Sequence, residues 1–106
     1  MRLSTISKRS HVAGRPGLAE AIGRELRRLR RERGLSQSAA GAPFTRSYVS
    51  SVERGHTLPS LPALLVLTES LGTTLEQFFR GVNTQMTVLY TQAHERHQDP
   101  APSGRR

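Results

Sequence analysis

The segment GLSQSAAGAPFTRSYVSSVERG, residues 34–55, decides the fold that this sequence predicts. Ser36 and Thr45 are typical N-cap residues, because their hydroxyls can accept hydrogen bonds from backbone N–H groups left free in the first helical turn. The Gly-Ala-Pro sequence at 41–43 interrupts a helix, and Gly55 is typical of a helix end. The segment therefore predicts two short helices joined by a tight turn, at 37–41 and 45–54.

Helical spacing continues on the N-terminal side of this segment. A first helix is predicted by apolar residues at helical intervals, and Gly34 is its expected end: Leu18, Ile22, Leu26 and Leu29. Residues 1–16 are rich in Ser, Arg and Gly and lack apolar periodicity. We expect them to form a flexible basic arm.

On the C-terminal side the sequence predicts two further helices. Ser60 is the expected cap of the fourth, and Pro62 is tolerated in its first turn. The expected buried face of this helix consists of Leu61, Leu64, Leu65, Thr68 and Leu71. Residues 73–76 fit a capping box that begins a fifth helix. Five short helices with short connections predict an all-α fold.

The residues after Gly81 are harder to assign. One set lies on a single helical face: Met86, Leu89, Tyr90, Ala93 and His97. Another set consists of poor helix formers and leaves a strand over 86–90 as an alternative: Thr84, Thr87, Val88 and Thr91. We favour a helical extension at 81–97, following a domain at 17–80 and preceding a disordered tail at 98–106.

Composition limits the class of protein. The chain has 106 residues and no cysteine, so it fits one domain without disulfides or thiolate metal sites. No apolar run approaches the ~20 residues needed to cross a bilayer, and no secretory signal is visible. We expect a cytoplasmic protein that makes no membrane contact and needs no metal or other cofactor.

The formal net charge of +8 is unevenly distributed. Residues 1–34 hold ten basic and three acidic side chains. Such a concentration favours a polyanionic partner such as nucleic acid. The alternative is an arginine-rich composition without functional meaning, since 15 of the 16 basic residues are arginine.

Several short motifs follow one another in a characteristic order. They are Leu-Ser-Gln at 35–37, Ser-Tyr-Val-Ser at 47–50, Glu-Arg-Gly at 53–55, Pro-Ser at 59–60 and Leu-Gly at 71–72. This set resembles the Cro and phage-repressor type of helix-turn-helix, also called XRE-like, over about residues 18–79. The resemblance implies a five-helix, lambda-repressor-like domain. It also implies a bacterial or phage transcriptional regulator, expected to be a repressor, that binds double-stranded DNA as a homodimer. The extension at 81–97, with Met86, Leu89 and Tyr90, is the candidate dimer surface; the alternative is a helix that packs on its own core.

The chain departs from the common family pattern in one place. Between Gln37 and Glu53 it is two residues shorter, and Gly-Ala-Pro stands where the usual turn would be. We expect a clipped second helix and a turn made rigid by Pro43.

The resemblance also implies roles for individual residues. Base contacts are implied for Arg46, Ser47 and Ser51. Contacts to, or ordering of, the phosphate backbone are implied for Gln37 and Thr45. For Glu53, which DNA would repel, it implies an internal ion pair with Arg30 of the first helix.

Physical chemistry favours the same recognition helix. A helix that enters the major groove needs hydrogen-bonding side chains near its N-terminus, and Arg46 is suited to bidentate contact with guanine. Val49 and Val52 lie on the opposite side and are expected to face the core. Phosphate contact is a further possibility, beside plain capping or solvent exposure, for Ser50, Arg54, His56 and Thr57.

Three other functions remain open on sequence grounds. An antitoxin-like module or co-regulator could use the same fold to bind a protein partner through the fifth helix and residues 86–97. Non-specific nucleic-acid binding could reside in the basic arm. An enzyme is disfavoured, because no nucleophile elbow or phosphate loop is present and the pair His94 and His97 is only a weak metal signal.

Overall fold

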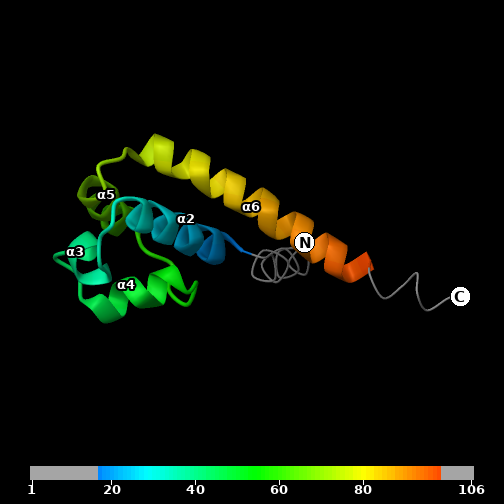
Figure 1. Cartoon of the computed structure of the whole chain (residues 1–106), viewed down its shortest axis with the longest axis horizontal. Coiled ribbons are helices and arrows are strands. Elements are labelled where there is room, and N and C mark those ends of the chain that lie inside the picture. Colours follow the sequence, from blue (N-terminus) through cyan, green and yellow to red (C-terminus); the bar gives the residue numbers. More distant parts are fainter. Residues whose placement is uncertain (1–16, 99–106) are drawn as a thin grey trace, which may run out of the picture.

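The computed structural model describes residues 17–98, with side chains described as far as Ala93 (Figure 1). This part of the chain contains five helices and no strand. They are α2 (Leu18–Glu32), α3 (Gln37–Gly41), α4 (Arg46–Glu53), α5 (Leu61–Ser70) and α6 (Leu75–Gln98). The all-α expectation is confirmed for these residues. The expected arm at 1–16 and the tail beyond Gln98 lie outside them.

Helix ends follow the local chemistry closely. The side chains of Ser36, Thr45 and Ser60 each accept a hydrogen bond from the backbone N–H three residues later, as N-caps do. Gly55 has φ +79° directly after the C-cap of α4, a conformation that favours glycine. The expected capping box at 73–76 is wrong by one position, because Thr74 rather than Thr73 accepts from the backbone N–H of Gln77.

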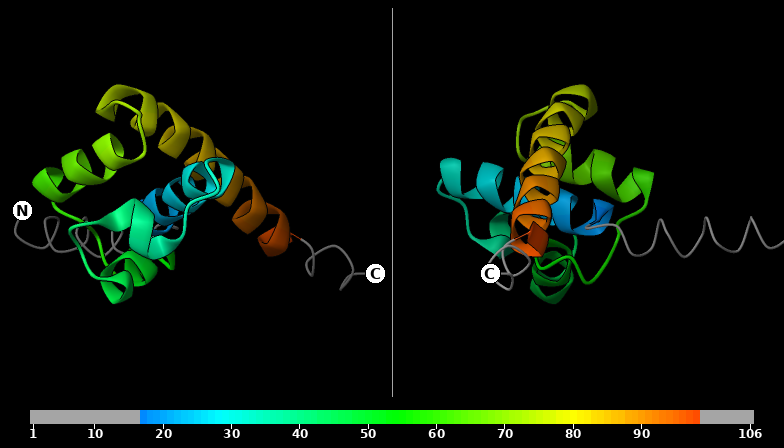
Figure 2. Two further views of the ribbon diagram at one scale, coloured as in Figure 1. Left: turned by 60° about the vertical axis from the view of Figure 1, so that its left-hand side comes forward. Right: turned by 90° about the vertical axis from the view of Figure 1, so that its right-hand side faces the viewer.

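Helix α2 lies at the centre, with α6 along one side and α4 along the other (Figures 1 and 2). Apolar residues from all five helices form one core. Its largest fully buried side chains include Ile22 and Leu26 of α2, Val52 of α4, Leu67 of α5 and Phe78 of α6. Because α2 packs against both α6 and α4, it determines the position of α4 on the core.

Two glycines allow the close packing around α2. A Cβ atom at Gly23 would overlap the backbone carbonyl oxygens of Val52 and Glu53 in α4. A Cβ atom at Gly81 of α6 would overlap the carboxylate of Glu25. Helix α4 therefore approaches α2 at a position where no side chain fits, and Gly81 leaves room for the Glu25 carboxylate beside α6.

The turn between α3 and α4 is as short as expected. Helix α3 ends at Gly41, and the N–H of Phe44 donates to the Gly41 carbonyl oxygen (2.7 Å). Gly41 is buried against Val49, where a Cβ would overlap the Val49 side chain. The shortened connection thus seats the end of α3 directly on the buried side of α4.

The expected buried face of α5 is partly wrong. Leu61 is 63% exposed and Leu65 is 47% exposed, whereas Leu64 and Thr68 are buried as expected. Leu67, which is absent from the expected face, is 1% exposed. Leucine occurs on every side of this helix, so its pattern does not define which side faces the core.

The residues after Gly81 are helical and continue α6 without a break. Val82 and Leu89 pack into the core, with Met86 against it. The hydroxyls of Thr84 and Thr87 donate to the carbonyl oxygens of Arg80 and Asn83 (3.3 and 3.1 Å). Packing on α2 and these bonds to the preceding turn accommodate residues of low helix propensity.

Candidate nucleic-acid interface

Helix α4 is fixed on one side and exposed on the other. Val49 and Val52 are 1% and 0% exposed and hold it against the core. Arg46 and Ser47, at its N-terminus, are exposed. The expected orientation of this helix is therefore confirmed, and its first turn presents polar side chains to solvent.

The N-terminus of α4 is held in a defined position. The Thr45 hydroxyl accepts from the Tyr48 N–H (3.1 Å). The rings of Phe44 and Tyr48 stack at a tilt, with centroids 4.9 Å apart. Thr45 thus serves as the cap, and the exposed residues that follow it are preorganised.

Ser51 and Thr57 belong together in the structure. Their hydroxyls share a hydrogen bond of 2.6 Å, and both residues are half-buried. The loop after α4 therefore fixes the direction in which the Ser51 hydroxyl can donate or accept. Sequence reasoning gave these two residues separate roles and did not place them in contact.

The ion pair expected between Arg30 and Glu53 is present. Arg30 Nε donates to Glu53 Oε2 (2.6 Å) and Nη2 donates to Oε1 (3.0 Å), so the contact is bidentate. Arg30 Nη1 also donates to the Leu35 carbonyl oxygen (2.9 Å). Arg30 thus links α2 to the end of α4 and to Leu35, which lies two residues before the start of α3.

Gln37 belongs to the same network, because its Nε2 donates to Glu53 Oε1 (3.1 Å). Burial alone would raise the pKa of Glu53, but hydrogen bonds from Arg30 and Gln37 and the charges of Arg30 and Arg27 outweigh it. The pKa of Glu53 is therefore lowered, and the carboxylate stays ionised at neutral pH.

A hollow lies beside this pair, between α2, the start of α3 and the second half of α4. It is lined by Arg27, Arg30, Arg31, Gln37, Ser50, Glu53 and Arg54. The structure thus brings together three residues expected to contact phosphate: Gln37, Ser50 and Arg54. His56 is exposed in the loop after α4 and does not line the hollow.

Charge pairing divides the arginines of the described residues into two groups. One group pairs with glutamates at 2.6–3.7 Å and consists of Arg24, Arg28, Arg30, Arg33 and Arg80. The other has no carboxylate within 4.0 Å in residues 17–93 and consists of Arg27, Arg31, Arg46 and Arg54. The arginines without a carboxylate partner therefore lie on α2 and at the two ends of α4.

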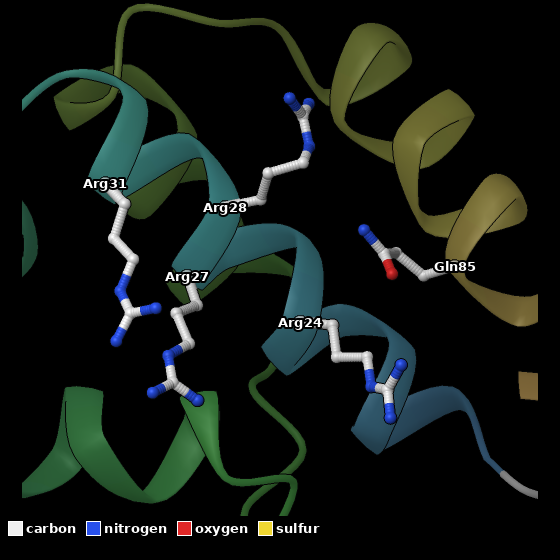
Figure 3. Close-up of a pocket in the computed structure, with 5 residues that line it drawn as sticks. All are labelled: Arg24, Arg27, Arg28, Arg31 and Gln85. Carbon is white, nitrogen blue, oxygen red and sulfur yellow. The ribbon is translucent and has the colours of Figure 1, made fainter. Parts of the chain in front are cut away.

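Sequence reasoning did not single out Arg27 and Arg31. The signal that could have found them is helical spacing. Arg28 has glutamates three residues before it and four after it, at Glu25 and Glu32, whereas Arg27 and Arg31 have none at three or four residues in either direction. The close-up of α2 shows Arg27 and Arg31 directed toward α4 and Arg28 directed toward α6 (Figure 3).

The described residues show no feature of a metal site or of a membrane span. They contain no group of three or more His, Cys, Asp or Glu residues placed to hold a metal ion. None of their helices combines the length and the apolar character that crossing a bilayer requires.

Residues 21–78 match the family model of a helix-turn-helix domain. The chain belongs to the helix-turn-helix family. The match begins in α2 and ends near the start of α6, so most of α6 lies beyond it.

Two curated relatives are similar over this domain. An uncharacterized HTH-type transcriptional regulator, y4dJ, of Sinorhizobium fredii is 39% identical over 57 residues, which are 52% of this chain and 74% of the relative. The HTH-type transcriptional regulator DdrOP3 of Deinococcus deserti is 42% identical over 59 residues, 54% of this chain and 46% of the relative. The chain thus spans less than half of the second relative.

A solved structure is similar over a larger share of the chain. It is the clp gene regulator ClgR from Corynebacterium glutamicum, with a TM-score of 0.72 at 25% identity. The similarity covers 78% of this chain and 90% of that one. Together with the motifs in residues 35–72, these relatives support the XRE-like type of helix-turn-helix.

Proposed function

We propose that the protein is a sequence-specific, double-stranded-DNA-binding transcriptional regulator that reads the major groove with α4. The observation that carries the proposal is the exposed N-terminal turn of α4, fixed from behind by Val49 and Val52 and flanked by unpaired arginines. Its relatives in the helix-turn-helix family, which carry the names of transcriptional regulators, support the same function.

Base contacts are assigned to Arg46, Ser47 and Ser51. The Arg46 guanidinium has no carboxylate partner among residues 17–93, and its planar fork matches the O6 and N7 acceptors of guanine. Ser47 and Ser51 are one helical turn apart, so they can face neighbouring base edges. The bond from Thr57 would orient the Ser51 hydroxyl toward that role.

Phosphate contacts are assigned to the residues around these base readers: Gln37, Thr45, Ser50, Arg54, His56 and Thr57. Gln37 Nε2 carries two hydrogens and uses one of them on Glu53, so it can still donate to a phosphate oxygen. The Thr45 hydroxyl accepts from the Tyr48 N–H as a cap, which orders the start of α4, and it keeps its own hydrogen to donate to a phosphate oxygen.

We further propose that the protein works as a homodimer on two half-sites about one helical turn apart, and that it is a repressor. Of the candidate dimer residues, Met86 and Leu89 pack on this chain's own core, whereas Tyr90 is 65% exposed. The exposed apolar side chains of α5 and α6, such as Leu61, Leu65 and Val88, are better placed for a second copy. A repressor needs only to occupy its operator, which a helix-turn-helix dimer can do.

Selection of bound sites from random duplex DNA tests this function. We expect the purified protein to enrich one motif with two-fold symmetry at moderate salt. If a folded protein enriched no motif, sequence-specific reading would be contradicted. The antitoxin-like or co-regulator function, through a protein partner, would then account better for the fold.

A further inference from the structure

The hollow beside the Arg30–Glu53 pair carries positive charge beyond that of the pair, which is itself neutral. Four arginines and one glutamate line it, which gives a formal net charge of +3. Glu53 is taken up by Arg30 through two hydrogen bonds. The guanidinium groups of Arg27, Arg31 and Arg54 face the same space and have no carboxylate within 4.0 Å among the described residues.

The hollow also continues the polar side of α4. Residues 46, 50 and 54 follow one another at intervals of four, so they lie along one edge of this helix. Arg46 begins this edge at the exposed N-terminus, and Ser50 and Arg54 line the hollow at its other end. Arg27 and Arg31 come from α2 and point toward α4 (Figure 3).

We propose that Arg27 and Arg31 of α2, together with Arg54, bind a backbone phosphate of the DNA whose major groove α4 reads. This inference rests on the proposed function and adds a helix outside the helix-turn-helix pair to the DNA contact. The hollow measures about 290 Å³, several times the roughly 30 Å³ that one water occupies, so it admits a phosphate group. Arginine forks suit phosphate oxygens, and Gln37 and Ser50 supply further polar groups beside them.

The salt dependence of binding to a short duplex of random sequence tests the inference. In R27Q/R31Q we expect the slope of log affinity against log salt to fall by about 0.9 for each bound subunit, because one phosphate contact is lost. A matched control is R33Q/R80Q, which loses the same charge from two arginines that pair with glutamates and do not line the hollow. R27K/R31K should keep most of the slope, since it keeps the charge.

The inference is overturned if R27Q/R31Q, shown by circular dichroism to be folded, changes the slope no more than the control does. It is also overturned if R27K/R31K loses as much slope as the glutamine variant. The proposed function is judged separately, by whether the wild-type protein enriches a motif. An R27Q/R31Q variant that enriches the same motif but binds all duplexes more weakly supports both.

Discussion

The two sides of α2 use the same residue type for different purposes. On the side facing α6, Arg28 binds Glu25 through two hydrogen bonds (3.0 and 2.7 Å), and Gln85 Nε2 of α6 donates to the same carboxylate (3.2 Å). On the side facing α4, Arg27 and Arg31 have no such partner in residues 17–93. The position of the glutamates thus decides the role of each arginine. An arginine that has a glutamate partner contributes to helix packing, and an arginine that has none is free for the proposed DNA contact.

The largest effect is expected from a substitution at the contact between α2 and α4. Gly23→Ala places a methyl group against the carbonyl oxygens of Val52 and Glu53, which are backbone atoms and cannot move aside. We expect a loss of about 3 kcal/mol in the free energy of unfolding, as for overpacked cores. Denaturant unfolding measures it. Arg80→Ala, at an exposed pair, is the control and should stay within about 0.5 kcal/mol.

A somewhat smaller effect is expected on the α6 side. Glu25 is 2% exposed, and Glu25→Ala would leave Arg28 and Gln85 without their shared acceptor. We expect a loss of about 2 kcal/mol in the free energy of unfolding, below the value for a fully buried pair because Arg28 is half exposed. The salt slope of DNA binding by the folded variant should not fall. If the salt slope fell as much as in R27Q/R31Q, the proposed difference between the α6 side and the α4 side of α2 would be contradicted.

Acid should weaken the α4 side through Glu53. Its pKa is lowered in the folded protein, so its contribution to stability is complete above the ordinary glutamate value of about 4.5 and is lost as the pH falls below it. Glu53→Gln should therefore be less stable at neutral pH, and less of its stability should be lost on acidification. Unfolding midpoints at neutral and acidic pH measure this. Equal acid sensitivity in Glu53→Gln and in Glu69→Gln, whose glutamate has no ion pair in residues 17–93, would contradict it.

The features that the sequence predicted well are local. Ser36, Thr45 and Ser60 cap their helices because an N-cap needs only its own hydroxyl and the next turn. The cap of α6 was misplaced by one residue because Thr73 and Thr74 are chemically equivalent candidates. The Arg30–Glu53 pair was also found, but through resemblance to a family rather than through spacing.

Features that depend on packing could not be predicted in the same way. Contacts with α3 and α6 determine which side of α5 faces the core. The leucines of α5 do not define that side, because some are buried and others are exposed. The contact between Ser51 and Thr57 depends on the path of the loop between them. The hollow lined by Arg27, Arg31 and Arg54 requires α2 and α4 to lie side by side, which Gly23 permits.

The most direct test of the account compares Arg46→Ala with the wild-type protein on two duplexes, the selected motif and a random sequence. Arg46 is exposed and has no ion pair in residues 17–93, so its removal should leave the fold intact. We expect affinity for the motif to fall about tenfold, equivalent to about 1.4 kcal/mol, with a clearly smaller loss on random DNA. An equal loss on both duplexes would contradict base reading by α4.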